Sequence, residues 1–222
     1  MLNIIDNIKL LDFFKTLDMD NLQKLSKLSI VNSYASGYVL YYEEDMKDKI
    51  FFLVDGLIKS YKVDRFDNEI FLNYIYPNTL ISEISSLHDE KVYCSTNTEF
   101  LQDSIVLEIN YGVFKKNFID TNILTTRLLD EIINKSKQLY CIIDREVVYD
   151  ATAKVAYSLY DDLRMFNKLK RQEVASMLHI QPATLSRILQ KLVRQNIINI
   201  ETTQIIIKQR DELKKIFNGC SL

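Results

Sequence analysis

The sequence predicts an α+β protein: an N-terminal antiparallel β-roll with flanking helices, a long helix, and a C-terminal winged helix-turn-helix. Three observations predict this order. Short β-rich runs follow one another between residues 38 and 109, helical spacing continues without Gly or Pro over 123–146, and two helical patterns flank a tight turn in 171–190. The predicted parts are 1–122 (roll), 123–150 (long helix and hinge) and 151–222 (winged helix).

The first 109 residues begin helical and become β-rich. Leucines at helical spacing in residues 2–30 predict N-terminal helices. Apolar runs bounded by turn-type residues then predict an antiparallel roll. Asp55-Gly56 separates two of these runs and is typical of a two-residue hairpin turn, so we expect a hairpin there. The runs are 39–42, 50–54, 57–63, 69–76 and 104–109.

The charge is unevenly distributed along the chain. Its 222 residues carry 28 Lys/Arg and 30 Asp/Glu, a formal charge of −2. Residues 151–222 hold twelve basic and six acidic side chains, so this part carries +6 and the remainder −8. A basic module attached to an acidic one is typical of a nucleic-acid reader with a separate regulatory part. The charge alone fits two ordinary domains equally well.

The composition also predicts a location. No apolar run approaches the roughly 20 residues needed to cross a bilayer. Residues 1–15 lack the basic start and apolar run of a signal peptide. The three cysteines, Cys94, Cys141 and Cys220, are far apart and odd in number, which suits reduced thiols. We therefore expect a cytoplasmic protein that does not bind a membrane.

The long helix carries a narrow apolar seam whose members recur at spacings of 3, 4, 3 and 4, with one polar break at Ser136. At a rise of 1.5 Å per residue the helix would be about 36 Å long, which suits a dimer axis. The alternative is a core helix packed on its own domain. Thr152, just after the helix, is the expected cap of the next one, which should run to about Leu163. The predicted dimer interface is Leu129, Ile132, Ser136, Leu139 and Ile143.

Residues 171–190, RQEVASMLHIQPATLSRILQ, fit a helix-turn-helix. Apolar residues recur at helical spacing in both halves, and Ala175 is small where the two helices must cross. His179 lies at the turn, where the backbone needs a positive φ that histidine tolerates better than most residues. Pro182 suits the first turn of the second helix. That helix, 182–193, is expected to enter the major groove of DNA.

The polar face of this second helix supplies candidate DNA contacts. Arg187 can bond bidentately to guanine, and Thr184 and Ser186 can reach phosphates or base edges. Two short apolar runs, 197–200 and 204–208, predict a two-stranded wing. An ordinary helical hairpin is the alternative. The candidate DNA-binding residues are Gln181, Thr184, Ser186, Arg187, Lys170, Arg171 and Lys191.

Specific motifs accompany this order of parts. They are RQEVASML and ATLSRIL in the C-terminal part, and Gly37, Gly56 and PNTLISEISSL (77–87) in the roll. With them, nearly the whole chain resembles the CRP/FNR superfamily of bacterial transcription regulators. The resemblance implies a homodimer whose roll binds a small effector and whose long helix transmits that event to the DNA-binding domains. It also implies a palindromic double-stranded DNA operator as partner, and RNA polymerase if the protein is an activator.

Departures from the family pattern argue against two known effector groups. Relatives that bind cyclic AMP carry a Glu and, ten residues later, an Arg that neutralises the phosphate. Glu83 is kept here, but Tyr93 takes the place of the Arg, and the nucleotide-contacting Thr-Ser pair falls on Leu139 and Tyr140. The phosphate charge would therefore stay uncompensated in a partly dry site. An iron–sulfur cluster needs four cysteine ligands, and the chain has three.

An apolar pocket between the roll and the long helix remains the expected effector site. Haem is one candidate, because some relatives sense gases with haem there, and His88 or Cys94 could be an axial ligand. The alternatives are a solvated loop histidine and a cysteine that is a small buried hydrophobe or a redox sensor. An apolar ligand, or DNA binding without any ligand, also stays open. The candidate pocket residues are Glu83, His88, Tyr93, Cys94, Leu139 and Tyr140.

The sequence holds no Ser-His-Asp or Cys-His arrangement, metal-ligand cluster or phosphate-binding Gly loop, so we expect neither an enzyme nor a metal site. Two functions remain: an effector-responsive transcription regulator, or a ligand-binding or partner-interaction protein that has lost DNA binding. Arg187 favours the first. The guanine-reading Glu of the family is Ala183 here, so the operator sequence does not carry over.

Overall fold

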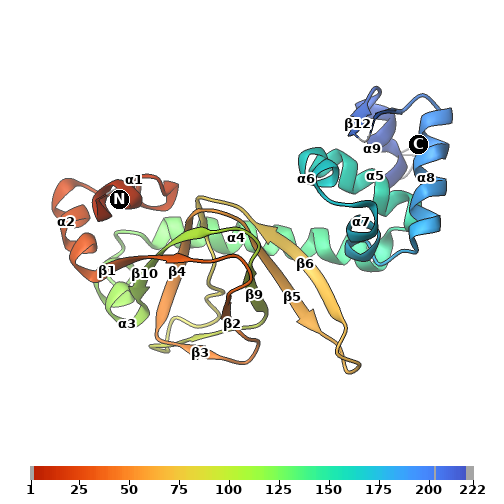
Figure 1. Ribbon diagram of the computed structural model, residues 1–222. Helices are drawn as coiled ribbons and strands as arrows, with labels where there is room; N and C mark the ends of the chain where they lie inside the picture. Colours follow the sequence, from red (N-terminus) through yellow and green to blue (C-terminus); the bar gives the residue numbers. More distant parts are fainter. Residues whose placement is uncertain (1–2, 203, 219–222) are drawn as a thin grey trace. The chain divides into compact units, whose positions relative to one another are not determined.

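The computed structural model describes residues 3–202 and 204–218. They belong to two compact units, Met1–Gln138 and Leu139–Leu222, which are treated separately below (Figure 1). Cys220 lies outside the described residues. In the part of the chain that is described, no helix is both long and apolar enough to cross a membrane.

The strands of the N-terminal unit form the predicted antiparallel roll, which is thereby confirmed (Figure 1). Two four-stranded sheets, in the orders β1-β10-β4-β7 and β2-β9-β5-β6, make its body, and β3 pairs with β8. The strands are β1 Ser29–Tyr34, β2 Val39–Tyr41, β3 Met46–Lys47, β4 Lys49–Asp55, β5 Ile58–Val63, β6 Glu69–Ile75, β7 Thr79–Leu80, β8 Val92–Tyr93, β9 Asn97–Phe100 and β10 Ser104–Asn110.

Strand β4 separates two apolar cores, because both of its faces are covered. Ile50 and Phe52 pack with the N-terminal helices, whereas Phe51 and Leu53 belong to the core inside the roll. The predicted apolar run therefore alternates between two buried environments. The helices of this unit before α4 are α1 Ile4–Lys9, a 3₁₀ turn Asp12–Phe14, α2 Met19–Leu28, α3 Tyr111–Phe114 and a π turn Lys115–Ile119.

The turn at Asp55-Gly56 does not close a hairpin, so that prediction is wrong. β4 pairs with β10 and β7, while β5 pairs with β6 and β9, and the turn carries the chain from one sheet to the other. Gly56 has a φ of +110°, and a Cβ there would lie 2.0 Å from Oγ of Ser104. The close approach of β10 therefore requires glycine.

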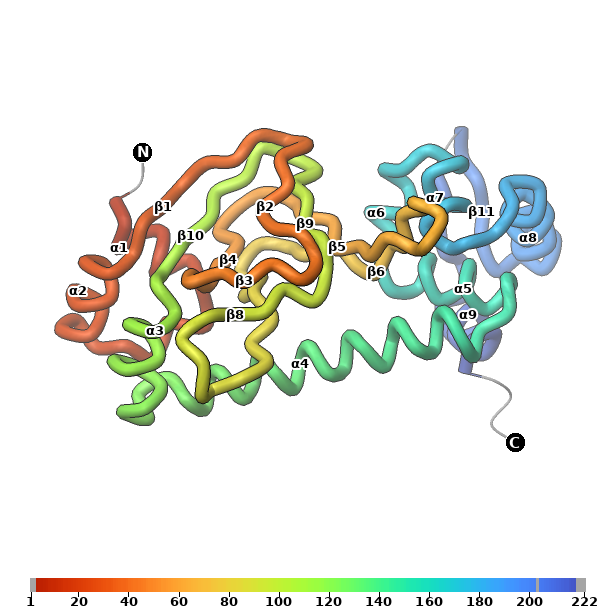
Figure 2. Tube along the Cα trace, turned by 90° about the horizontal axis from the view of Figure 1, so that it is seen from below, coloured from red at the N-terminus to blue at the C-terminus, as the bar shows by residue number. Residues whose placement is uncertain are grey.

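The long helix is confirmed as α4, Thr125–Ile143, which Figure 2 shows as one continuous helix. It ends in a π turn, Asp144–Val148. Leu124 and Leu128 are buried at its start, and Ile132 packs partly against the same core as the N-terminal helices. These contacts anchor the first half of α4 to the roll.

The C-terminal unit is the predicted winged helix-turn-helix. Its first helix is capped by Asp150, whose carboxylate accepts a hydrogen bond from the Ala153 amide at 2.8 Å, so Thr152 is not the cap. Asp162 starts a further helix in the same way through the Met165 amide, at 2.9 Å, so the predicted helix is divided. The elements are α5 Ala151–Asp161, α6 Leu163–Lys168, α7 Arg171–Met177, α8 Pro182–Arg194, β11 Ile198–Glu201, β12 Gln204–Ile207 and α9 Arg210–Asn218.

Candidate nucleic-acid interface and effector site

The turn between α7 and α8 sets the direction of α8. His179 has a φ of +52°, which confirms the positive φ expected there. The amide of Ile180 donates to the Ala175 carbonyl and that of His179 to the Ser176 carbonyl, both at 3.0 Å. This is the hydrogen-bond pattern by which a helix ends at a left-handed residue. Ala175 is 1% exposed, as a close crossing of two helices requires.

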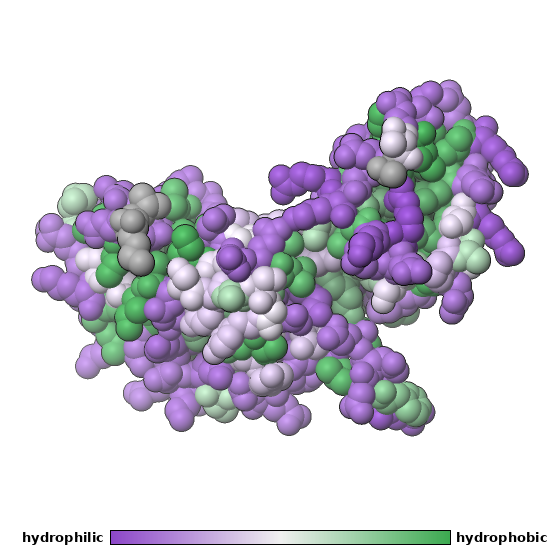
Figure 3. Space-filling model, in the orientation of Figure 1, coloured by the Kyte–Doolittle hydropathy of each residue, from purple (hydrophilic) through white to green (hydrophobic). Residues whose placement is uncertain are grey.

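The outer face of α8 carries the candidate base contacts. Arg187 is exposed, and its guanidinium forms no ion pair with any residue that the structure describes. Ser186 is also exposed, but its hydroxyl donates to the Pro182 carbonyl at 3.0 Å, so only its lone pairs remain available. Thr184 is half-buried. Polar side chains project along the edge of the unit that α8 forms (Figure 3).

The other predicted contacts divide into exposed and packed side chains. Gln181, Lys191 and Lys170 are exposed. Arg171 is half-buried, its guanidinium lies 5.5 Å from the centre of the Phe166 ring, and burial lowers its pKa. It therefore packs within the unit rather than projecting from it. Sequence reasoning missed two exposed residues of α8, Gln190 and Arg194, although they follow Arg187 at helical spacing.

A cluster around Glu146 joins the segment after α4 to the helix-turn-helix. Its carboxylate accepts hydrogen bonds from Nε of Arg145 at 2.6 Å and from Nζ of Lys154 at 3.1 Å, and it lies 2.9 Å from Nδ1 of His179. Burial by itself would raise the pKa of Glu146, but the contacts with His179, Arg145 and Lys154 outweigh it and hold the pKa at about 2. No local sequence pattern predicts this cluster.

This cluster predicts an acid-side loss of stability. A carboxyl whose pKa falls from 4.5 in the unfolded chain to about 2 in the folded one stabilises the fold above pH 4.5 and loses that effect as the pH falls towards 2. Glu146→Gln should therefore lower the free energy of unfolding by about 1–2 kcal/mol at neutral pH, after allowance for solvent screening, and by little near pH 2. Denaturant unfolding followed by circular dichroism across this range measures it. A difference that does not change with pH would contradict the prediction.

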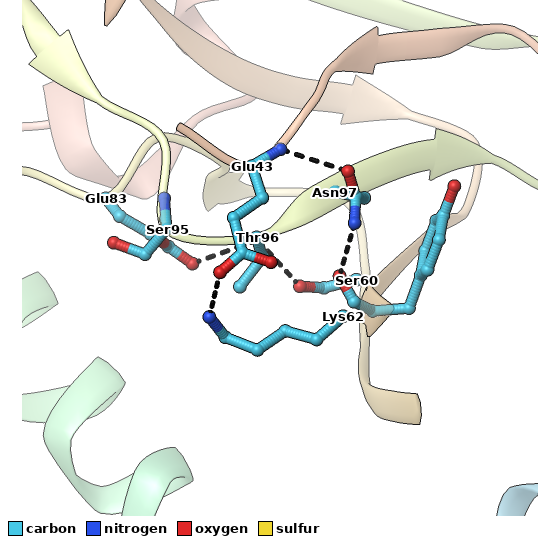
Figure 4. A network of polar contacts seen from close by, with 8 residues as sticks. Glu43, Ser60, Lys62, Glu83, Ser95, Thr96 and Asn97 are labelled. Atoms are coloured by element: carbon cyan, nitrogen blue, oxygen red, sulfur yellow. Dashed lines mark hydrogen bonds and ion pairs between the residues drawn. The ribbon is translucent and has the colours of Figure 1, made fainter. Parts of the chain in front are cut away.

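Within the roll, Glu83 lies in a network of polar side chains (Figure 4). One carboxylate oxygen accepts from the Ser95 amide at 3.1 Å and the other from the Thr96 hydroxyl at 3.2 Å. Ser60 in turn donates to the Thr96 hydroxyl at 3.0 Å. These contacts fix the position of the carboxylate.

Among the remaining predicted pocket residues, only Cys94 lies buried near Glu83. Burial raises the pKa of its thiol to about 11, so it stays protonated at neutral pH, which argues against a reactive thiolate. His88 and Tyr93 are exposed. The two candidate haem ligands, His88 and Cys94, therefore do not share a buried site. Leu139 and Tyr140 lie exposed on α4. In the described part of the chain, no three His, Cys, Asp or Glu side chains are grouped to hold a metal ion.

The structure also supplies a cation that sequence reasoning missed. Lys135 extends from α4, and its Nζ donates to the Ile81 carbonyl, two residues before Glu83, at 3.2 Å. Lys135 and Glu83 are 52 positions apart, so no local pattern relates them. The positive charge near Glu83 therefore comes from the long helix and not from the strand position that Tyr93 occupies.

The exposed apolar side chains of α4 include Leu129, Leu139 and Ile143 of the predicted seam, together with Ile133 and Tyr140. Ile133 and Tyr140 are 51% and 69% exposed, and they lie with Leu129, which is 54% exposed, on one stripe of the helix. Ile132 instead packs partly against the core. We call the set Leu129, Ile133, Ser136, Tyr140 and Ile143, which recurs at spacings of 4, 3, 4 and 3, the α4 face.

Comparisons with known proteins agree with both units. The model of the cyclic nucleotide-binding domain matches residues 31–120, and that of the Crp-like helix-turn-helix domain matches residues 153–216. No curated protein matches the chain.

Three solved structures show the same fold. A CooA variant from Carboxydothermus hydrogenoformans has a TM-score of 0.72 at 17% identity, with 94% of this chain and 95% of that chain covered. FixK2 from Bradyrhizobium japonicum has a TM-score of 0.64 at 19% identity, covering 85% and 96%. The regulator CLP from Xanthomonas campestris has a TM-score of 0.62 at 16% identity, covering 86% and 99%.

Proposed function

The chain belongs to the CRP/FNR superfamily, whose members are DNA-binding transcription regulators and not enzymes, and from this we propose that it acts as a sequence-specific homodimer. In this proposal α8 reads the major groove, α4 joins two copies, and the roll controls the position of the DNA-binding units. The proposed location is the cytoplasm, where such a regulator meets its DNA.

The observation that carries the DNA-binding role is the outer face of α8. Arg187 lies there without an ion pair to any described residue, so its guanidinium is available for a bidentate contact with guanine. Lys191 and Arg194 follow on the exposed side, where they can contact phosphates. The buried residues of α8 fix this orientation, since Leu185 and Leu192 are fully buried on the opposite side.

The α4 face supports the dimer. Large apolar side chains that are about half exposed or more, at alternating spacings of 4 and 3, are typical of a helix that packs against a second helix. A monomer would leave this stripe in water. Two copies related by a two-fold axis would cover it and place two α8 helices for a palindromic operator.

The test of DNA binding is a titration of purified protein against random-sequence duplex DNA at several salt concentrations. The affinity should fall steeply with salt, because bound phosphates release counterions. Absence of binding at low salt would instead favour the alternative, a ligand-binding or partner-interaction protein that has lost DNA binding.

For the effector, we propose a ligand other than cyclic AMP. CLP is described as responsive to c-di-GMP, so one fold serves regulators with other signals, and at 16% identity its ligand does not carry over. Here both oxygens of Glu83 already accept hydrogen bonds from Ser95 and Thr96. A ribose hydroxyl would have to share these oxygens with the internal donors.

We expect no binding of cyclic AMP or cyclic GMP below the millimolar range. Tyr93 cannot neutralise a phosphate, and the Lys135 ammonium already contacts the Ile81 carbonyl. The missing charge-assisted bond is worth roughly 1.5–3 kcal/mol. Titration calorimetry measures this directly, and micromolar affinity for either nucleotide would contradict the proposal.

A further inference from the structure

Lys135 joins α4 to the segment that follows β7. Its Nζ donates to the Ile81 carbonyl at 3.2 Å, and the same carbonyl accepts from the Tyr41 hydroxyl at 3.4 Å. The side chain is partly buried. Desolvation lowers the pKa of Lys135, while the nearby carboxylates of Glu83 and Glu131 oppose this shift.

Two carboxylates act electrostatically on this ammonium. Glu83 comes from the roll and Glu131 from α4, and both are negative groups that act on Lys135. The other polar groups of the roll interior near Glu83 are the hydroxyls of Tyr41 and Thr96. Both carboxylates therefore favour a positive charge at this position.

The interior of the roll also contains an unpaired polar atom. Thr98 is fully buried, and it is paired in register with Tyr41 on one neighbouring strand and with Ser60 on the other. The Tyr41 hydroxyl donates to Ile81, and Oγ1 of Thr98 has no hydrogen-bond partner among the described residues. A buried hydroxyl in this state is a further acceptor in the roll interior, on the strand between Tyr41 and Ser60.

We infer that Lys135 is an internal ligand of the roll: its ammonium binds the Ile81 carbonyl, under the influence of the Glu83 and Glu131 carboxylates, and holds α4 against the roll. The Ile81 carbonyl lies two residues before Glu83 in the chain. The regulatory meaning of the contact rests on the proposed function, since α4 leads to the DNA-binding unit. The contact itself does not depend on DNA binding.

Hydrogen–deuterium exchange of the full chain tests this contact. Lys135→Met keeps the length and apolar stem of the side chain but removes the charge. Exchange of amides in 80–87 and 131–138 should rise roughly tenfold, while α7 and α8 stay unchanged. Lys137→Met, an exposed lysine one position beyond Ser136 on the same helix, is the matched control and should exchange like the wild type.

A rescue experiment separates an ammonium site from a merely structural side chain. Lys135→Ala removes the equivalent of n-propylamine, so n-propylammonium at tens of millimolar should restore protection of 80–87. Propan-1-ol and propionate should not. Equal exchange in Lys135→Met and Lys137→Met, or equal rescue by amine and alcohol, would overturn the inference. If circular dichroism shows that the alanine variant is unfolded, the comparison of the two methionine variants decides.

DNA binding is measured separately on the same proteins. If the exchange and rescue results are as expected but the wild type binds no DNA, the proposed function is contradicted and the internal ligand stands. If the wild type binds DNA but Lys135→Met shows the same exchange as Lys137→Met, only the internal ligand is contradicted.

Discussion

Ile133→Asp is expected to convert the protein to a monomer and to abolish specific DNA binding. Ile133 belongs to the α4 face, and a carboxylate there would be buried against the partner helix without a partner of its own, at a cost of several kcal/mol. The dimer should weaken by at least two orders of magnitude. Sedimentation velocity measures the loss of the dimer, and a mobility shift measures the loss of DNA binding.

Asn134→Asp is the matched control, because it introduces a carboxylate one residue further along the same helix, at an exposed position off the α4 face. This variant should remain a dimer. Ile132 is a poorer choice for the test, since it packs partly against the core of its own unit and a charge there would destabilise the fold. An intact dimer in Ile133→Asp would remove α4 from the interface.

Arg187→Ala is expected to weaken binding to a specific site by about 5- to 150-fold, which corresponds to the roughly 1–3 kcal/mol of a bidentate guanine contact. Binding to random DNA should change little. The folded unit should keep its stability, because Arg187 is exposed and forms no ion pair with a described residue.

Lys191→Ala provides the contrasting result. If Lys191 contacts a phosphate, its loss should weaken binding to all sequences alike and reduce the salt dependence by about one charge. Mobility shifts on a specific and a random duplex compare the two variants. Equal losses on both duplexes for Arg187→Ala would show that Arg187 contacts only phosphate.

The helix-turn-helix could be predicted because its determinants lie close together in the sequence. The turn at His179, the small residue Ala175 and the N-terminal Pro182 all act on neighbours within a few positions, and each is found as expected. Helix periodicity likewise predicted α4 and the burial pattern of α8. Local patterns are sufficient where the interacting residues are local.

The features that were predicted wrongly or missed depend on contacts between residues far apart in the sequence. Asp55-Gly56 has the composition of a hairpin turn, but pairing with β10, about 50 residues later, decides that β4 and β5 belong to different sheets. Packing also decides which apolar residues of α4 stay exposed, because Ile132 packs partly against the roll core while Ile133 is exposed. The partners of Lys135 and Glu146 are likewise set by the fold. One-dimensional spacing cannot supply such information.

Selection of bound sequences from a random duplex library, with the wild-type chain, tests the central claim most directly. We predict enrichment of an inverted repeat whose half-sites lie one helical turn apart, about 10 base pairs centre to centre, bound by two chains per duplex. Native mass spectrometry of the selected complex gives that stoichiometry. A selected pool indistinguishable from the starting library, or a single half-site bound by one chain, would contradict a dimeric sequence-specific regulator.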